Sequence, residues 1–237
     1  MPTDKKLART AASITRQPNQ IILPLSGPPS SGKTSVKKYL DSIGFTTIPE
    51  FAGQIIKESK AGKHDLHPET CMYKFNNENF KRQVRAEKKL QHASLVLPDR
   101  SMYDPFAYFE MFELNLPEYL QVLPSKLYNT VFIFDRLPWV NDGIRHEGDK
   151  FAEAIEPYFK STYTHRGVDL IHVPVFTFTE DDLTDAEQLS LSKETDYETR
   201  QSNLKQLLID KSIAKRGQYI IGKIKANFPE VELPPGV

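Results

Sequence analysis

The feature that most constrains the fold is a glycine-rich loop at residues 27–34, with an apolar run before it and a helix-forming run after it. The loop reads GPPSSGKT and matches G-x-x-x-x-G-K-[ST] at every fixed position. Gly27 and Gly32 allow a tight turn whose backbone N–H groups face inward on phosphate oxygens. The positive dipole end of the following helix adds to this site. The sequence therefore predicts that the chain binds a nucleoside triphosphate.

Each polar residue of this loop has an expected role. Lys33 reaches the β- and γ-phosphates, and the Thr34 hydroxyl binds Mg²⁺. A chance match in a surface turn is the alternative, but the flanking strand and helix argue against it. The residues expected to contact the nucleotide are Gly27, Ser30, Ser31, Gly32, Lys33, Thr34 and Ser35.

Composition narrows the class of protein. The 237 residues are 39% hydrophobic and 26% charged, which is ordinary for one globular domain. Lys and Arg together number 31, as do Asp and Glu, so no global positive field favours nucleic acid and none is expected as a partner. The single cysteine, Cys71, excludes an internal disulfide and a cysteine-only metal site.

The first 19 residues have no apolar core of the kind that secretory signals carry. No stretch of the chain approaches the roughly 20 apolar residues of a membrane-spanning helix. We expect a cytoplasmic protein whose residues 1–19 form a flexible tail. An organellar transit peptide is the less favoured alternative, because Lys5, Lys6, Arg9 and Arg16 stand against one acid, Asp4.

Apolar strand patterns alternate with helix patterns along the chain, which predicts an α/β fold with a parallel sheet between helices. We expect a three-layer domain over residues 20–227, with five strands in one sheet. An acidic insertion at about 176–197, containing a short helix, interrupts the pattern on the nucleotide side, and residues 228–237 form a C-terminal tail. The expected strands are 21–25, 45–48, 94–98, 130–134 and 168–175, and the main helices are 34–43, 51–61, 69–93, 102–112, 149–166 and 198–227.

Polar residues follow three of these strands, at the sheet edge where α/β proteins bind ligands. Glu50 follows the second strand and could accept the proton of an attacking hydroxyl. A helix first-turn acid is the structural alternative. Asp99 follows the third strand, where a carboxylate holds Mg²⁺ directly or through water, and Arg100 beside it can bind a phosphate or the substrate hydroxyl region. An ordinary ion pair is the alternative for this pair.

Two arginines bracket the loop that follows the fourth strand, at residues 137–144. Arg136 lies at the exit of that strand, and Arg145 closes the loop. Arginines on closing loops stabilise the charge of a moving phosphoryl group and exclude water. Arg145 is the better candidate for catalysis and Arg136 for nucleotide binding, while a solvated surface arginine is the alternative for Arg145.

Four segments, GPPSSGKT, IPEFAGQII, LPDRSMYDPFAYFE and FDRLPWVNDGIRHEGD, resemble the small P-loop kinases related to nicotinamide riboside kinase. More broadly they resemble the AAA-labelled P-loop domains grouped with them and the deoxynucleoside kinases. The resemblance covers residues 20 to about 175 and implies a nucleoside- or nucleotide-kinase-like fold. In such kinases a short loop after the fifth strand packs on the base, whereas the acidic insertion follows here, so the choice between ATP and GTP stays open.

The resemblance also implies site residues. Glu50 matches the acid taken as the base in nucleoside kinases, Asp99 and Arg100 match an acid-Arg-Ser motif, and Arg145 matches a lid arginine. Asp104 falls where related domains keep an acid that positions substrate. The acceptor pocket is expected between the helix 69–93 and the aromatic segment 103–112.

Three functions fit these residues. The favoured one is ATP-dependent phosphoryl transfer to a small, nucleoside-like hydroxyl acceptor with Mg²⁺, with Glu50, Lys33, Arg100 and Arg145 as the catalytic set. The second is an ATPase or GTPase switch that acts through a protein or lipid partner. The third, a binding protein without turnover, is opposed by the intact Lys33, Thr34 and Asp99. The acceptor and the oligomeric state are left open.

Overall fold

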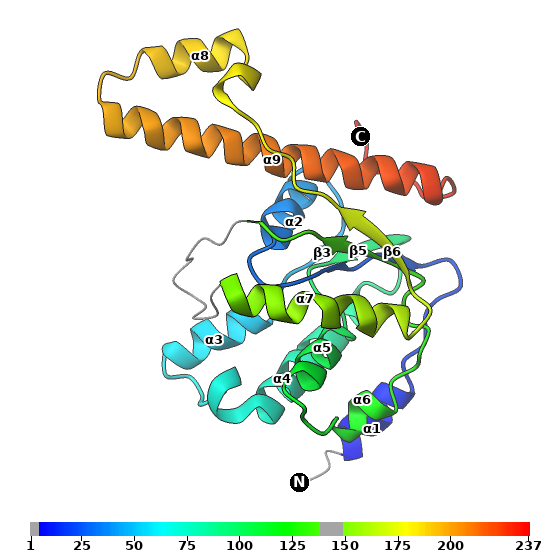
Figure 1. The fold of residues 1–237 in the computed structure, drawn as a ribbon. Helices are drawn as coiled ribbons and strands as arrows, with labels where there is room; N and C mark the ends of the chain where they lie inside the picture. Colours follow the sequence, from blue (N-terminus) through cyan, green and yellow to red (C-terminus); the bar gives the residue numbers. More distant parts are fainter. Residues whose placement is uncertain (1–4, 138–148) are drawn as a thin grey trace.

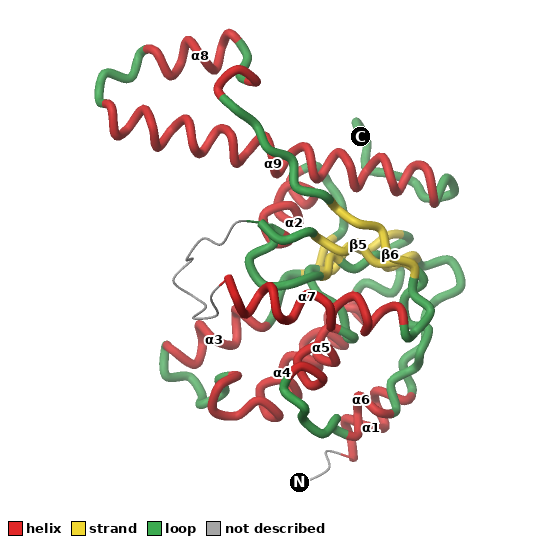
Figure 2. The backbone as a smooth tube through the Cα atoms, viewed as in Figure 1, coloured by secondary structure: helices red, strands yellow, loops and turns green. Residues whose placement is uncertain are grey.

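Parallel strands form the central layer of the computed structural model, which describes residues 5–137 and 149–237. Figure 2 shows these strands between two layers of helices. The strands pair in the orders β1-β4-β3 and β2-β5-β6. Their bounds are β1 (Ile21–Ile22), β2 (Leu25–Ser26), β3 (Thr47–Ile48), β4 (Leu95–Pro98), β5 (Thr130–Phe134) and β6 (Asp169–Val173).

The expected single five-stranded sheet is wrong, because Pro24 divides the first strand into β1 and β2. Proline has no N–H for the strand ladder, although its carbonyl accepts the N–H of Phe132 at 2.9 Å. β1 therefore pairs with β4, whereas β2 pairs with β5. Two three-stranded parallel sheets result, linked by an isolated parallel bridge between Leu25 and Asp99. The α/β class and the parallel pairing are confirmed.

The helices follow the strands much as the hydrophobic periodicity predicts. The segment expected at 198–227 is a helix from Tyr197 to Asn227, and that expected at 149–166 runs from Asp149 to Thr164. Their bounds are α1 (Lys5–Ala12), α2 (Lys33–Ser42), α3 (Ala52–Lys60), α4 (Pro68–Lys89), α5 (Asp104–Met111), α6 (Glu118–Gln121), α7 (Asp149–Thr164), α8 (Asp185–Ser192) and α9 (Tyr197–Asn227), with a 3-10 turn η1 (Glu180–Asp182).

Alternate side chains of each strand enter different cores, as the two-residue period of a strand requires. Phe132 and Phe134 of β5 pack on the side covered by α2 and α9. Val131 and Ile133 point to the opposite core, which α4, α5 and α7 cover (Figure 1). Because both faces are covered, β4 and β5 are buried along their whole length, and the carboxyl ends of the strands are the edge left for a site.

Residues 5–16, which the sequence analysis assigned to a flexible tail, form an ordered part of the fold. Leu7, Ala8, Ala11 and Ile14 are buried, and α1 packs against α6 (Figure 1). The Arg16 guanidinium pairs with the buried Glu87 carboxylate of α4 at 2.6 Å. The apolar spacing in this segment spans only two turns among many basic residues, so the sequence gives a weak helix signal.

The acidic segment after β6 forms a helical hairpin that contains η1 and α8, and the expected short helix is confirmed. Here α8 packs along the N-terminal half of α9, and the two extend beyond the body of the protein (Figure 1). Lys211 of α9 pairs with Glu187 at 2.9 Å. Several of its acids cap helices: the Asp196 carboxylate accepts the N–H of Thr199, which lowers the pKa of Asp196. Local capping therefore accounts for part of the acidic composition.

Two further features complete the fold. Residues 228–237 return along the body, and the side chains of Val231, Leu233 and Val237 pack on the core beneath α2 and α9. Within the described ranges, none of the helices combines the length and the apolar character that crossing a membrane requires.

Candidate nucleotide and acceptor site

The loop between β2 and α2 has the backbone that the sequence predicts. Gly27 and Gly32 adopt φ values of 128° and 82°, and Ser30 adopts 58°. A Cβ at Gly27 would lie 2.9 Å from the carbonyl oxygen of Phe134, so the close approach of β5 requires glycine there. The N-terminus of α2 begins at Lys33, and no side chain caps it. Its backbone N–H groups are thus directed into the loop, as an anion site requires.

Lys33 is buried, with 4% of its surface exposed. Its ammonium group donates to the Pro28 carbonyl at 2.6 Å and to the Ser31 hydroxyl at 2.7 Å. The Lys33 side chain therefore folds back onto the loop that precedes it. A compact ammonium with three donors can exchange such contacts for phosphate oxygens.

Thr34 and Asp99 come together as predicted. The Thr34 hydroxyl donates to Asp99 Oδ2 at 2.6 Å, and Asp99 is fully buried at the end of β4. Asp99 Oδ1 is buried without a hydrogen-bond partner among the described residues. Burial and then the charge of Glu50 raise the pKa of Asp99, a cost that a nearby cation would relieve. The Thr34 hydroxyl and the Asp99 carboxylate supply oxygen atoms that fit Mg²⁺. This ion binds few protein ligands and takes the rest from phosphates and water.

No group of three or more His, Cys, Asp and Glu side chains that could hold a metal occurs in the part of the chain that the structure describes. A metal at Thr34 and Asp99 would therefore need the nucleotide itself for further ligands.

Arg100 connects the phosphate loop to Glu50, the predicted base. Its NH1 group donates to the Gly27 carbonyl at 2.6 Å, and its Nε lies 3.3 Å from Glu50 Oε1. Burial alone lowers the pKa of Arg100, but Tyr108, Glu50 and other acidic groups raise it above its ordinary value. Its NH2 nitrogen makes no hydrogen bond with another described residue, and can therefore serve a phosphoryl or acceptor oxygen.

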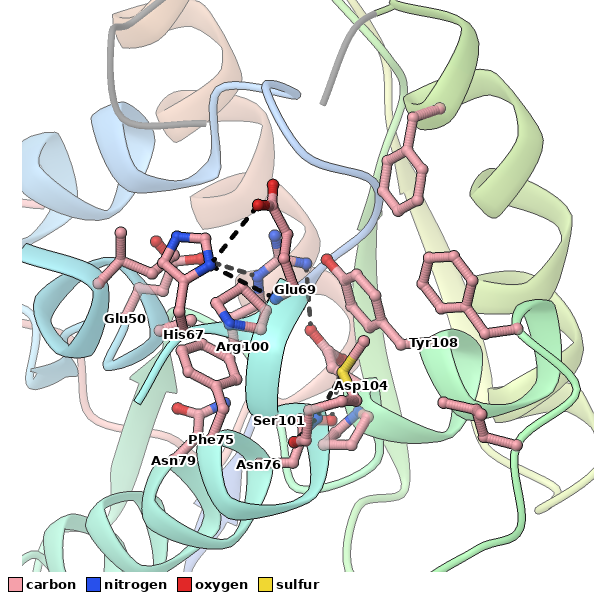
Figure 3. A pocket seen from close by; sticks show the side chains of 18 residues that line it. Glu50, His67, Glu69, Phe75, Asn76, Asn79, Arg100, Ser101, Asp104 and Tyr108 are labelled. Atoms are coloured by element: carbon pink, nitrogen blue, oxygen red, sulfur yellow. Dashed lines mark hydrogen bonds and ion pairs between the residues drawn. The ribbon is translucent and has the colours of Figure 1, made fainter. Parts of the chain in front are cut away.

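Glu50 stands two residues after β3, with 11% of its side chain exposed. Its carboxylate lies beside Arg100 and lines a cavity of about 630 Å³. Figure 3 shows Arg100 between Glu50 and Asp104, bonded to both. The structure thus brings together Lys33, Thr34, Asp99, Arg100 and Glu50, which three separate stretches of sequence supply.

Asp104 positions Arg100. Its Oδ1 accepts hydroxyl groups from Ser26 at 2.7 Å, from Ser101 at 3.1 Å and from Tyr163, while its Oδ2 lies 3.4 Å from Arg100. Burial, followed by the charge of Asp104, raises the pKa of Tyr163 well above its ordinary value, so its hydroxyl stays a donor. The sequence analysis missed Tyr163, because it is an unremarked tyrosine on a helix 59 residues beyond its acceptor.

The cavity beside Glu50 lies among α3, α4, α5 and α7, so it includes the space between the helix 69–93 and the segment 103–112. One end is polar and the remainder is mainly apolar and aromatic. The Asn79 amide, on α4, makes no hydrogen bond with another described residue. The lining residues are Glu50, Ala52, Ile56, His67, Pro68, Glu69, Met72, Phe75, Asn76, Asn79, Arg100, Ser101, Asp104, Pro105, Tyr108, Phe112, Leu114 and Phe151.

A second cavity, of about 400 Å³, shares no lining residue with the first. The segment after β6 and the outer half of α9 form most of its wall, with Phe176 and Leu204 among the apolar members. Leu137, also in the wall, stands beside the loop: a Cβ at Gly32 would lie 2.8 Å from its Cδ1.

Ser30 and Ser31 keep their predicted places in the loop, and Ser35 is exposed in the first turn of α2. Arg136 follows β5, and its NH2 lies 4.0 Å from the Glu153 carboxylate of α7. Arg145, the predicted lid arginine, falls outside the described residues.

Comparisons with known proteins agree with this geometry at the level of the family. The family model described as AAA domain, AAA_28, matches residues 23–181. No curated protein gave a match.

Solved structures give weak similarities. Thymidylate kinase from Ehrlichia chaffeensis is 18% identical, with 74% of this chain and 97% of that chain covered and a TM-score of 0.46. Deoxyadenosine kinase from M. mycoides with bound dATP is 11% identical, with coverage of 73% and 97% and a TM-score of 0.44. Shikimate kinase from Acinetobacter baumannii in complex with shikimate is 15% identical, with coverage of 80% and 99% and a TM-score of 0.37. These values are too low to assign a substrate.

The matched region contains the phosphate loop, Glu50, Asp99 and Arg100, and it ends at the start of the helical hairpin. The earlier resemblance to AAA-labelled P-loop domains is therefore confirmed. The chain is a P-loop NTPase and belongs to the AAA_28 family of AAA domains.

Proposed function

We propose that the protein is a kinase that transfers the γ-phosphoryl group of ATP to a hydroxyl of a small, nucleoside-like acceptor. The observation that carries this proposal is the position of Glu50 and Arg100. They lie between the phosphate loop and the 630 Å³ cavity, and Arg100 is bonded to the loop through Gly27. A cavity of this size suits an organic acceptor, whereas hydrolysis needs room only for water.

The residues have distinct roles in the proposed reaction. The loop 27–34 and Lys33 bind the phosphates, and Glu50 accepts the acceptor's hydroxyl proton. Arg100, held by Asp104, offsets charge on the moving phosphoryl group through its NH2 nitrogen. Thr34 and Asp99 would hold Mg²⁺, which neutralises phosphate charge when bound.

The second cavity is the place that we propose for the nucleotide base. It adjoins the loop at Leu137, and its apolar wall suits a flat heterocycle. The acceptor and the base would then occupy two cavities that share no lining residue. In this arrangement the two substrates stay in separate cavities, and only the phosphoryl group moves from one to the other.

The experiment that tests the proposal is nucleotide turnover by the purified protein. ATP and GTP are compared, each alone and with a pool of nucleosides and other small hydroxyl compounds, and products are identified by mass spectrometry. We expect ADP formation that depends on one acceptor, with phosphate on that compound. Hydrolysis at a rate indifferent to every acceptor would contradict the kinase proposal.

The alternative function is an ATPase or GTPase switch that works through a protein or lipid partner. The hairpin of α8 and α9 favours it, because this hairpin extends beyond the body and exposes Leu189, Tyr197 and Ile209 by 58%, 72% and 41%. Acceptor-independent hydrolysis would support this function.

A further inference from the structure

Arg216 of α9 is a buried arginine that the proposed reaction does not use. It is 1% exposed, and its guanidinium stacks on the Phe134 ring at 4.7 Å. All its hydrogen bonds go to backbone carbonyls. They are Nε to Pro174 at 2.9 Å, NH1 to Ser31 at 2.6 Å, NH2 to Asp135 at 3.0 Å and NH2 to Val173 at 3.0 Å.

No carboxylate makes a hydrogen bond or ion pair with Arg216 among the described residues, although the nearby charge of Asp135 acts to raise its pKa. Burying an ion without a counter-ion costs stability, and neutral carbonyl groups offset only part of that cost. Burial lowers the pKa of Arg216 to about 10, so the guanidinium stays positive at neutral pH. An apolar side chain would hold α9 on β5 and β6 with less penalty. Because Asp135 bonds to Arg216 only through its backbone carbonyl, the retained charge points to a further anion nearby.

The phosphate loop is the element that Arg216 contacts. Ser31, whose carbonyl accepts the 2.6 Å bond, directly precedes Gly32 and Lys33 in the loop. The contact is close, because a Cβ at Gly32 would lie 3.0 Å from Arg216 NH1. With the Ser31 carbonyl fixed on Arg216, the peptide N–H of Gly32, on the opposite side of that peptide, is directed away from the arginine.

We propose that Arg216 is a positioning residue for phosphate binding. It fixes the Ser31–Gly32 peptide so that its N–H serves the phosphates, and it places a permanent positive charge behind the loop. The proposal rests on the nucleotide binding proposed above. Because the effect is electrostatic, it grows with the number of phosphates on the ligand.

The test compares R216M and R216K with wild type in the full chain. The dissociation constants of a nucleoside tri-, di- and monophosphate are measured by calorimetry at fixed Mg²⁺. We expect R216M to weaken triphosphate binding by about tenfold or more, diphosphate less and monophosphate least. R216K retains the charge, and we expect it to keep the preference for triphosphate while melting at a lower temperature, because it lacks the planar guanidinium that reaches four carbonyls.

The matched control is R166M. Arg166 also stacks on an aromatic ring, Phe106, at 3.6 Å and donates to one carbonyl, but it contacts no residue of the loop 27–34. We expect R166M to bind all three nucleotides like wild type. A purely structural role for Arg216 would lower the three affinities by one common factor, and that result would overturn the proposal.

A second measurement decides the case if R216M does not fold. In the wild-type protein, the Arg216 Nε–H resonance should shift on addition of triphosphate, and less with diphosphate. No shift at saturation, or a lysine variant without preference for triphosphate, contradicts the proposal. Wild-type protein that binds no nucleotide overturns the proposed function as well, whereas nucleotide binding with equal losses in R216M overturns this inference alone.

Discussion

At the scale of single residues, the backbone of Arg100 is strained. Its φ of 90° is a conformation that residues other than glycine rarely adopt, and it costs on the order of 1–3 kcal/mol. The compensation comes from bonds to Gly27, Glu50 and Asp104, which fix the guanidinium at the boundary between loop and cavity. Strain that surrounding contacts hold in place is typical of preorganised sites.

The first prediction concerns Glu50. We expect E50Q to lower kcat by about 10²–10⁴-fold, because an amide cannot accept the hydroxyl proton, with smaller effects on ATP binding. Steady-state kinetics with the identified acceptor measure this. E110Q makes the same change at an exposed position of α5 that does not line the cavity, and it should react like wild type. A wild-type rate in E50Q would show that Glu50 is not the base.

The residues of the site differ in how far the sequence could predict them. Lys33 and Thr34 belong to a continuous motif, and Glu50, Asp99 and Arg100 follow from the rule that strand ends share one edge of a sheet. Tyr163 and Arg216 have no such rule, since Arg216 and its acceptor Ser31 are 185 residues apart. Only packing of α7 and α9 on the strands brings these two side chains to the site.

At the scale of elements, the packing of α9 on α2 depends on one glycine. Gly217 faces the Tyr39 ring so closely that a Cβ there would lie 2.3 Å from Cδ1 and 2.4 Å from Cε1. Gly222 lies one and a half turns further along the same helix, and a Cβ there would meet nothing within 4 Å. The two glycines therefore separate the effect of close packing from that of helix propensity.

We expect G217A to lower the free energy of unfolding by about 1–3 kcal/mol, because the added methyl group overpacks the interface. G222A should raise it by about 0.5–1 kcal/mol, because alanine favours the helix. Urea denaturation followed by circular dichroism measures both. Equal effects from the two substitutions would contradict the packing that the structure shows.

A second prediction at this scale concerns the ion pair between α3 and α4. Hydrogen bonds from Arg82 lower the pKa of Glu58 from 4.5 to about 2. Because the folded-state pKa is depressed, the pair's stabilisation is fully present above pH 4.5 and is lost as pH falls toward 2.

Melting temperatures from pH 7 to pH 2 measure this effect. The difference between wild type and E58Q should shrink on acidification, whereas E118Q, at an exposed glutamate without an ion pair in the described structure, should follow wild type throughout. A constant difference between wild type and E58Q would contradict the assignment.

Elements were predicted where a long periodic pattern exists, as for α9, and missed where the signal is short. The N-terminal helix α1 has eight residues, and Pro24 interrupts a run that otherwise reads as one continuous strand. In both cases tertiary contacts decided the outcome. Leu7 and Ala11 of α1 are buried against the body of the protein. The run around Pro24 forms two strands because β1 pairs with β4 and β2 pairs with β5.

At the scale of the whole molecule, the two cavities are lined by different elements and share no residue. The helices α3, α4, α5 and α7 line one, and the segment after β6 with α9 lines the other. The proposed function assigns the acceptor to the first and the base to the second. Changes in one cavity should therefore affect one substrate only.

Leu204→Trp tests this separation. The larger side chain fills the second cavity, and we expect the KM for nucleotide to rise by about tenfold or more while the KM for acceptor stays unchanged. Leu207→Trp is the control, because Leu207 lies on the same helix and does not line the cavity. A rise in the acceptor KM alone would place the acceptor, not the base, in this cavity.

The geometry of α9 has a mechanical consequence. Nineteen residues separate Tyr197, at its free end, from Arg216, which is fixed to the loop. This outer part is about 28 Å long at 1.5 Å per residue, so a tilt of about 5° at Arg216 would move its tip by about 2.5 Å. The inner end of this part of α9 contacts the phosphate loop through the bond from Arg216 to Ser31. Any tilt of α9 about its contact with the loop would therefore displace the tip of the hairpin far more than Ser31.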